Sequence, residues 1–114
     1  MIVVVPSHDK KNLPLPEAQK AEWASNAMQL LADLYGGATA YETYSGIFKT
    51  DEGHYLRDKP LLIESFATIA AIQNPELLEQ LVNVAKRMGK TLDQDTIMLV
   101  FGTVSYYIKD YGGV

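Results

Sequence analysis

Two stretches of helical periodicity, set between segments rich in β-branched and aromatic residues, constrain the fold of this chain most strongly. In the first stretch, from Glu17 to Tyr35, apolar residues recur every three or four positions. Pro16 stands where a first-turn proline belongs, and Gly36 follows the last periodic residue. A proline at the start and a glycine just past the end are typical of helix boundaries. The pattern therefore predicts an amphipathic helix over residues 17–35.

The second helical stretch begins at Asn74. This residue is a good N-cap, Pro75 fits the first turn, and Glu76 places a negative charge near the positive end of the helix dipole. Leucine, valine and alanine then repeat at helical spacing as far as Gly89. We expect a second amphipathic helix over residues 75–89.

Four segments outside the helices have the composition of strands. Thr50–Gly53 is a polar turn between two of them, and Pro60 interrupts the second with a bulge at residues 58–60. Residues 7–16 form a loop that is long for a strand-to-helix connection, and residues 110–114 are expected to fray. The predicted strands cover residues 1–6, 38–49, 54–69 with that interruption, and 96–108.

The resulting order, β-α-β-β-α-β, predicts an α+β fold of the ferredoxin-like class, with both helices on one face of a four-stranded antiparallel sheet. The opposite face would then carry several tyrosines without cover. Large apolar patches on soluble proteins usually mark an interface. We therefore expect a homodimer formed through that face. The alternative is a monomer whose tyrosines bridge core and solvent.

Composition excludes several classes of function. The 114 residues fit one domain, and the absence of cysteine excludes disulfides, thiolate metal sites and a cysteine nucleophile. The net charge of -4 argues against binding to a nucleic acid polymer. No apolar run is long enough for a membrane span or a secretory signal, so we expect a cytoplasmic protein.

Short motifs around the predicted hairpin resemble a family of short bacterial, plasmid and phage proteins with no assigned activity. Those proteins tend to show a Gly-Gly-Ala-Thr turn, a Gly-x-Trp strand, an acidic-Gly turn and an Arg-Glu pair. The matching segments here are Gly36–Thr39, Gly46–Phe48, Asp51–Gly53 and Arg57-Asp58. Phe48 stands where the family usually has Trp, and Asp58 where it usually has Glu. The resemblance implies the α+β layout and leaves the function open.

No established catalytic motif is present. The two histidines lack metal-ligand spacing, and neighbouring side chains such as those of Ser7-His8-Asp9 are expected to diverge rather than form a hydrolase triad. No phosphate-binding glycine motif opens a helix, and we predict no cofactor. An arginine among aromatic side chains nevertheless suits an anion or a stacked base. The candidate ligand or partner site therefore comprises Tyr41, Glu42, Tyr44, His54, Tyr55, Arg57, Asp58 and Tyr106.

Three hypotheses of function follow. The first is a small homodimeric, non-enzymatic interaction module that binds a partner through its open sheet face and hairpin. The second is a dimeric α+β-barrel enzyme in which two domains enclose a pocket for a small molecule. The third is a phage or plasmid type of binder for a host defence protein or a nucleotide signal, with Arg57 and Lys59 contacting a small anion.

Overall fold

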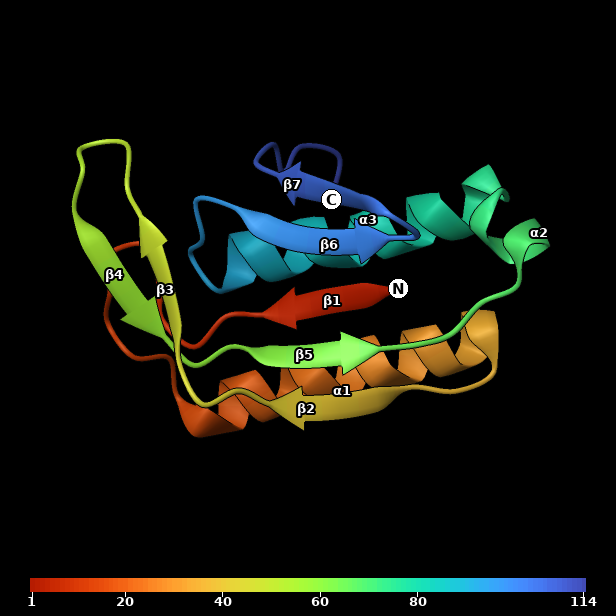
Figure 1. Cartoon of the computed structure of the whole chain (residues 1–114), viewed down its shortest axis with the longest axis horizontal. Helices are drawn as coiled ribbons and strands as arrows, with labels where there is room; N and C mark the ends of the chain where they lie inside the picture. Colours follow the sequence, from red (N-terminus) through yellow and green to blue (C-terminus); the bar gives the residue numbers. More distant parts are fainter.

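The computed structural model describes all residues from 1 to 114, and Figure 1 shows the order of the elements. The helices are α1 (Glu17–Tyr35), the short α2 (Ile69–Ile72) and α3 (Pro75–Thr91). The strands are β1 (Ile2–Val5), β2 (Thr39–Glu42), β3 (Gly46–Lys49), β4 (Tyr55–Asp58), β5 (Leu61–Glu64), β6 (Ile97–Phe101) and β7 (Val104–Ile108).

The strands form a five-stranded antiparallel sheet and a separate hairpin. The order in the main sheet is β2-β5-β1-β6-β7, whereas β3 pairs only with β4. The predicted α+β class and antiparallel pairing are confirmed, but the predicted count of four strands is wrong. The fifth strand arises because the segment expected to be one strand over residues 96–108 turns at Gly102 and folds back as β7.

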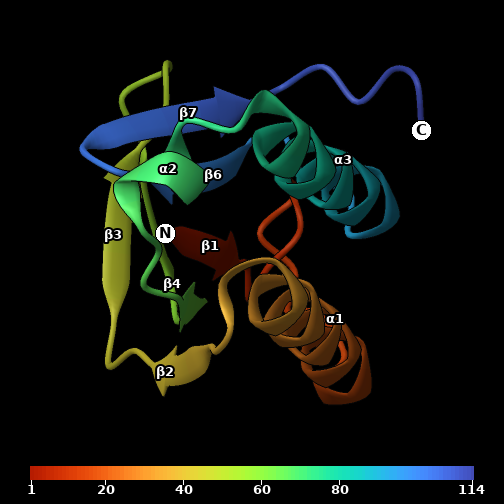
Figure 2. The same cartoon turned by 90° about the vertical axis from the view of Figure 1, so that its right-hand side faces the viewer.

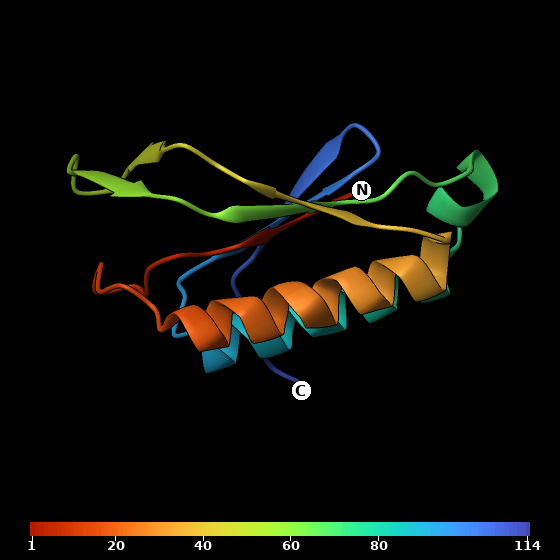
Figure 3. The ribbon, with the colours of Figure 1, turned by 90° about the horizontal axis from the view of Figure 1, so that it is seen from below.

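Both long helices lie on the same face of the main sheet (Figures 2 and 3). Alternate strand residues such as Val3, Ile63 and Leu99 point toward the helices and are fully buried against residues such as Leu31 and Leu81. This single apolar layer is the core. The residues between them in the strands face the other way, where Figure 3 shows no helix.

Both ends of α1 and the start of α3 agree with the sequence signals, whereas α3 continues past the predicted end at Gly89 to Thr91. Gly36, directly after α1, adopts a left-handed conformation with φ 95°, which a glycine reaches without steric cost. At the start of α3, the Asn74 side chain accepts a hydrogen bond from the amide of Glu76. None of the helices is both long enough and apolar enough to cross a bilayer.

The segment expected to be one long strand over residues 38–49 is broken, because the chain leaves the main sheet after β2. At this break the Thr43 hydroxyl donates to the Pro60 carbonyl at 2.7 Å, so the two connections to the hairpin are held together. The hairpin β3–β4 therefore extends beyond the end of the sheet (Figure 1). Its predicted turn is confirmed, since the Thr50 amide donates to the His54 carbonyl at 2.8 Å.

Two further expectations are corrected. The strand predicted to continue to residue 69 ends at Glu64, and the chain then turns into α2. The tail expected to fray is docked, because the Tyr111 hydroxyl donates to the Gln94 carbonyl at 2.9 Å. The Tyr111 ring also packs directly over Gly89, where no side chain keeps it away.

Candidate functional site

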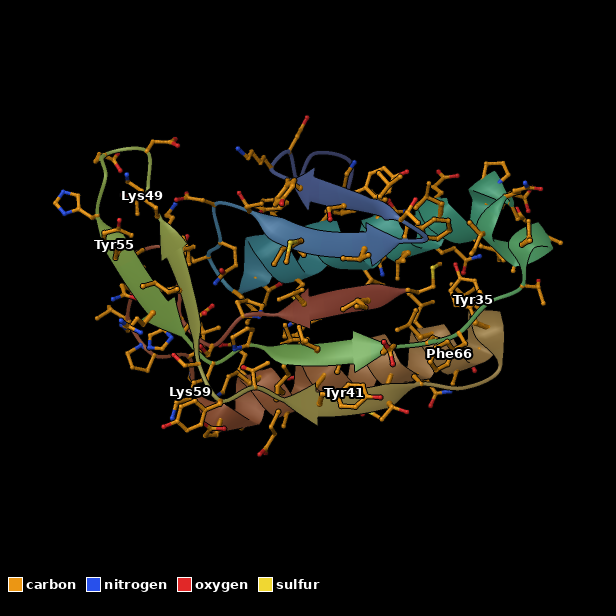
Figure 4. All side chains as sticks on the ribbon, in the orientation of Figure 1. Tyr35, Tyr41, Lys49, Tyr55, Lys59 and Phe66 are labelled. Carbon is orange, nitrogen blue, oxygen red and sulfur yellow. The ribbon has the colours of Figure 1, made fainter.

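Two open hollows lie at opposite ends of β5. The first, which we call the Glu64 hollow, has a volume of about 430 Å³ and is lined by Gly37, Ala38, Thr39, Glu64, Ser65 and Phe66. The second, the hairpin-base hollow, has a volume of about 390 Å³ and is lined by Ser7, His8, Pro14, Leu15, Glu17, Lys20, Ser45, Arg57, Asp58 and Lys59. Phe66 and Lys59 mark the two ends in Figure 4.

Strand pairing builds the Glu64 hollow. Ile63 points toward the helices and is fully buried, so the next residue, Glu64, projects from the uncovered face beside its partner Thr39. The floor is fixed by Ser65, which is almost fully buried and donates its hydroxyl hydrogen bond to the Gly37 carbonyl. The hollow therefore has a rigid backbone floor and one charged wall.

The chemistry of the Glu64 hollow is that of a carboxylate among aromatic rings. The Tyr41 hydroxyl donates to Glu64 Oε1 at 3.2 Å. This hydrogen bond, together with the negative charge of Glu64, raises the pKa of Tyr41. The Phe66 side chain is 84% exposed beside the carboxylate. Because Glu64 is the only charged residue of the lining, the hollow favours a cationic or aromatic ligand.

The hairpin-base hollow joins the long loop after β1 to the end of β4. The Ser7 Oγ accepts a hydrogen bond from the Lys59 amide at 2.8 Å and lies 2.8 Å from Nδ1 of His8. The Ser7 side chain is only 4% exposed, so these contacts are sheltered from water. The expectation that the Ser7 and His8 side chains diverge is therefore wrong. Asp9 does not join them, because its carboxylate accepts from two amides of its own loop.

The Asp58 carboxylate also lines this hollow and interacts electrostatically with His8. Burial raises the pKa of Asp58, and the neighbouring His8 opposes part of that rise. The carboxyl lies against Gly46, its partner in the hairpin, where an added Cβ would be 2.5 Å from Oδ1. The Gly-x-aromatic strand and the Arg-acid pair noted in the sequence are therefore two sides of one hairpin. The glycine leaves the space that the carboxyl occupies.

The residues predicted as one site do not converge. Tyr41 belongs to the Glu64 hollow, whereas Arg57 and Asp58 line the hairpin-base hollow. The remaining five residues lie elsewhere. Glu42 is exposed at the end of β2, Tyr44 is 94% exposed in the connection to the hairpin, His54 and Tyr55 lie toward its tip, and Tyr106 packs against the core from β7.

Glu64 and Phe66 were not among the predicted site residues. The signal was a single acid at the end of the apolar run Leu61–Ile63, followed two residues later by an aromatic residue. His8 was considered only as a metal ligand or a triad member, and Lys59 only as an anion contact. No group of three or more histidine and acidic side chains gathers closely enough to hold a metal ion.

Comparisons with known proteins bear on the fold. No protein-family model matches the chain, and a search of curated proteins finds no relative. Among solved structures, the chain is similar to a phage SAM lyase in complex with S-methyl-5'-thioadenosine. The TM-score is 0.66 at 8% sequence identity, and the match covers 97% of this chain and 88% of that one. At this identity the likeness shows a shared fold.

The likeness corrects our first hypothesis of function. We expected a non-enzymatic interaction module, but the solved structure to which this chain is similar is a phage SAM lyase in complex with a small molecule. The second hypothesis, an α+β enzyme acting on a small molecule, agrees with the comparison better. The predicted resemblance to a family of phage and plasmid proteins remains a prediction.

Proposed function

We propose that this protein is an enzyme that cleaves a small adenosylated sulfonium compound, with SAM (S-adenosylmethionine) as the first substrate to test. The single observation that supports the proposal is the similarity to the phage SAM lyase over 97% of the chain. Function depends on sites rather than on folds, so the proposal also needs a hollow whose chemistry suits such a substrate.

The charge of the substrate favours the Glu64 hollow. The sulfur of SAM is a sulfonium cation, and a carboxylate beside aromatic rings is a suitable environment for a cation. The Glu64 carboxylate, the Phe66 ring and the Tyr41 hydroxyl provide such a set. The hairpin-base hollow carries three formal positive charges, Lys20, Arg57 and Lys59, against the two acids Glu17 and Asp58. It is therefore the poorer site for a sulfonium.

The reaction defines what Glu64 can contribute. Formation of S-methyl-5'-thioadenosine from SAM breaks the bond between sulfur and the four-carbon chain, and the electron pair leaves with sulfur. The chain must then lose a proton or be closed by its own carboxylate. The positive charge on sulfur disappears during this step, so the attraction to Glu64 is greater in the bound substrate than in the transition state. We therefore assign Glu64 to substrate binding, which acts mainly on KM.

A second copy of the chain completes the site in this proposal. Glu64 and Tyr41 lie on the uncovered face of the sheet, together with exposed Tyr107 and the half-buried Leu62 and Val100. An apolar face of this kind is typical of an interface. A partner placed there would cover the Glu64 hollow and exclude water from it. The homodimer expected from the sequence is therefore part of the enzymatic proposal and is tested with it.

The test is direct. Purified protein is incubated with SAM, and S-methyl-5'-thioadenosine is measured by liquid chromatography with mass spectrometry. We expect the wild type to form this product. We expect Glu64→Gln to lower kcat/KM roughly 10- to 100-fold, mainly through KM, because it loses a charge-assisted contact. The matched control is Glu52→Gln, at the exposed turn of the hairpin, which should keep wild-type activity.

The second product, which is formed from the four-carbon chain of SAM, shows how that chain reacts when its bond to sulfur breaks. A lactone indicates closure by the substrate's own carboxylate, and an unsaturated amino acid indicates loss of a proton to a base. If Glu64→Gln lowered kcat rather than KM, and an unsaturated product formed, Glu64 would be the base and our assignment would be wrong. Folded wild-type protein that forms no thioadenosine from SAM would contradict the proposed reaction itself.

A further inference from the structure

We propose that the hairpin-base hollow is a binding site for a small oxyanion, a phosphate or carboxylate group carried on a small organic molecule. This site is separate from the Glu64 hollow and does not depend on the proposed lyase reaction. Two unpartnered cations line the hollow, one of its two acids is already paired, and hydrogen bonds hold the backbone around them.

The two cations at the end of β4 have no partner within the chain. The ion pairs of the structure are Lys10 with Asp93 and Lys20 with Glu17. Neither the Arg57 guanidinium nor the Lys59 ammonium forms an ion pair or a hydrogen bond to a protein acceptor. Arg57 has five donors in a planar fork that matches a carboxylate or a phosphate. Both side chains line the hollow and are free to contact a ligand.

The cations of the hollow outnumber its acids. Glu17 is paired with Lys20 at 2.8 Å, so its charge is already compensated. The half-buried Asp58 is then the one acid that opposes an anion, against the two unpaired cations Arg57 and Lys59. With three cations against two acids, the lining has a formal charge of +1 in a chain of net charge -4.

Hydrogen bonds hold together the two segments that present these groups, the loop after β1 and the end of β4. The Lys59 amide donates to the buried Ser7 Oγ at 2.8 Å, which ties the end of β4 to the loop after β1. Because His8 directs Nδ1 toward the Ser7 hydroxyl, its Nε2 atom has no protein partner and is available to a ligand. The Leu15 amide also donates to the Ser7 carbonyl, at 2.9 Å, and fixes the apolar wall of Pro14 and Leu15.

The size of the hollow indicates more than an inorganic ion. Its volume of about 390 Å³ is in the range of small-molecule sites, roughly 300 to 1,000 Å³. The apolar wall suits the organic part of such a ligand, and the cations suit its anionic group. Three probes therefore separate the possible ligands: inorganic phosphate, adenosine monophosphate and citrate.

The chain has two histidines, which makes proton NMR of the imidazole signals a sharp test at constant pH. We expect titration with the probes to shift the His8 signal and to leave that of His54, which is exposed near the hairpin tip, in place. In the double variant Arg57→Gln/Lys59→Gln, we expect the apparent affinity to fall at least about tenfold. The control Lys49→Gln, on β3 of the same hairpin, should bind as the wild type does.

Two further variants separate this site from the lyase proposal. Asp58→Asn removes a repulsive charge and should raise the affinity roughly threefold. Glu64→Gln should leave anion binding unchanged, whatever its effect on SAM. A shift with phosphate or the nucleotide alone assigns a phosphate ligand, and a shift with citrate alone assigns a carboxylate. If no probe shifts His8, or if the double variant binds as tightly as the wild type, the proposal is wrong.

Discussion

The two hollows lie at opposite ends of the same short strand, β5, yet the charges that line them are opposite. The Glu64 hollow has one carboxylate, a hydrogen-bonded tyrosine and an exposed phenylalanine. The hairpin-base hollow has three cations, two acids and a serine–histidine contact. The first is built on regular strand pairing, and the second on irregular connections.

This difference shows how a small fold separates two kinds of ligand. Strand pairing places Glu64 on the uncovered face as the only charged side chain of its hollow, and the nearest cation shown is the N-terminal ammonium of Met1, which donates to the Ser65 carbonyl at 3.0 Å. At the other end, the hairpin leaves the sheet and brings Arg57 and Lys59 against the loop after β1. Each hollow therefore attracts the charge that the other repels.

Reversing the charge of each hollow in turn is the strongest test of this separation. Glu64→Lys should lower formation of thioadenosine from SAM by at least about 100-fold, because a cation then faces the sulfonium. Arg57→Glu should change it less than about threefold. Steady-state kinetics on both variants measures the effect. Equal losses in the two variants would show that the hollows act as one site.

The proposed dimer connects only the Glu64 hollow to a partner. Tyr107 is 62% exposed on the uncovered face. In Tyr107→Glu we expect the dimer to dissociate, because the interface would bury a carboxylate of each copy. The mass measured by light scattering should fall from about twice the chain mass of 12.7 kDa to the mass of one chain. Enzymatic activity should fall roughly tenfold. Tyr44→Glu, in the exposed connection to the hairpin, is the control. A monomeric wild type would contradict the interface.

Gly46 tests the hairpin-base hollow alone. In Gly46→Ala the new Cβ would lie 2.5 Å from Asp58 Oδ1, so we expect the carboxyl to turn toward solvent. The raised pKa of Asp58 should then return toward its ordinary value, as measured by carbon NMR of the carboxyl group. Gly37→Ala is the control, because its Cβ would meet no atom within 4 Å. An unchanged pKa in Gly46→Ala would show that this contact does not position the carboxyl.

The smallest effect concerns stability. Burial raises the pKa of Asp58 in the folded protein, so its favourable contribution is present below the ordinary pKa of an aspartate. This contribution is lost as the pH rises through the raised value. Relative to Asp58→Asn, the wild type should therefore lose stability across that acidic range, by less than about 1 kcal/mol because the side chain is only half-buried. Urea unfolding of both proteins at several pH values measures this difference.

Much of the local structure was predictable from the sequence. The helix α1 begins and ends at the predicted residues, and the cap of α3 and the hairpin turn are as expected. These features depend on neighbouring residues alone. The break after Glu42 was not predictable in this way, because the contact that accompanies it joins Thr43 to Pro60, far along the chain.

The candidate sites, like the fold, were predictable from the sequence only in part. The sequence by itself determined the periodicity, the caps, the turns and the order of elements, because each is encoded within a few consecutive residues. It also singled out Tyr41, Arg57 and Asp58. Only the tertiary structure decided that Tyr41 meets Glu64 while the other two line one hollow with His8 and Ser7. Strand order and the direction of the hairpin bring these residues together, and both follow from packing across the whole chain.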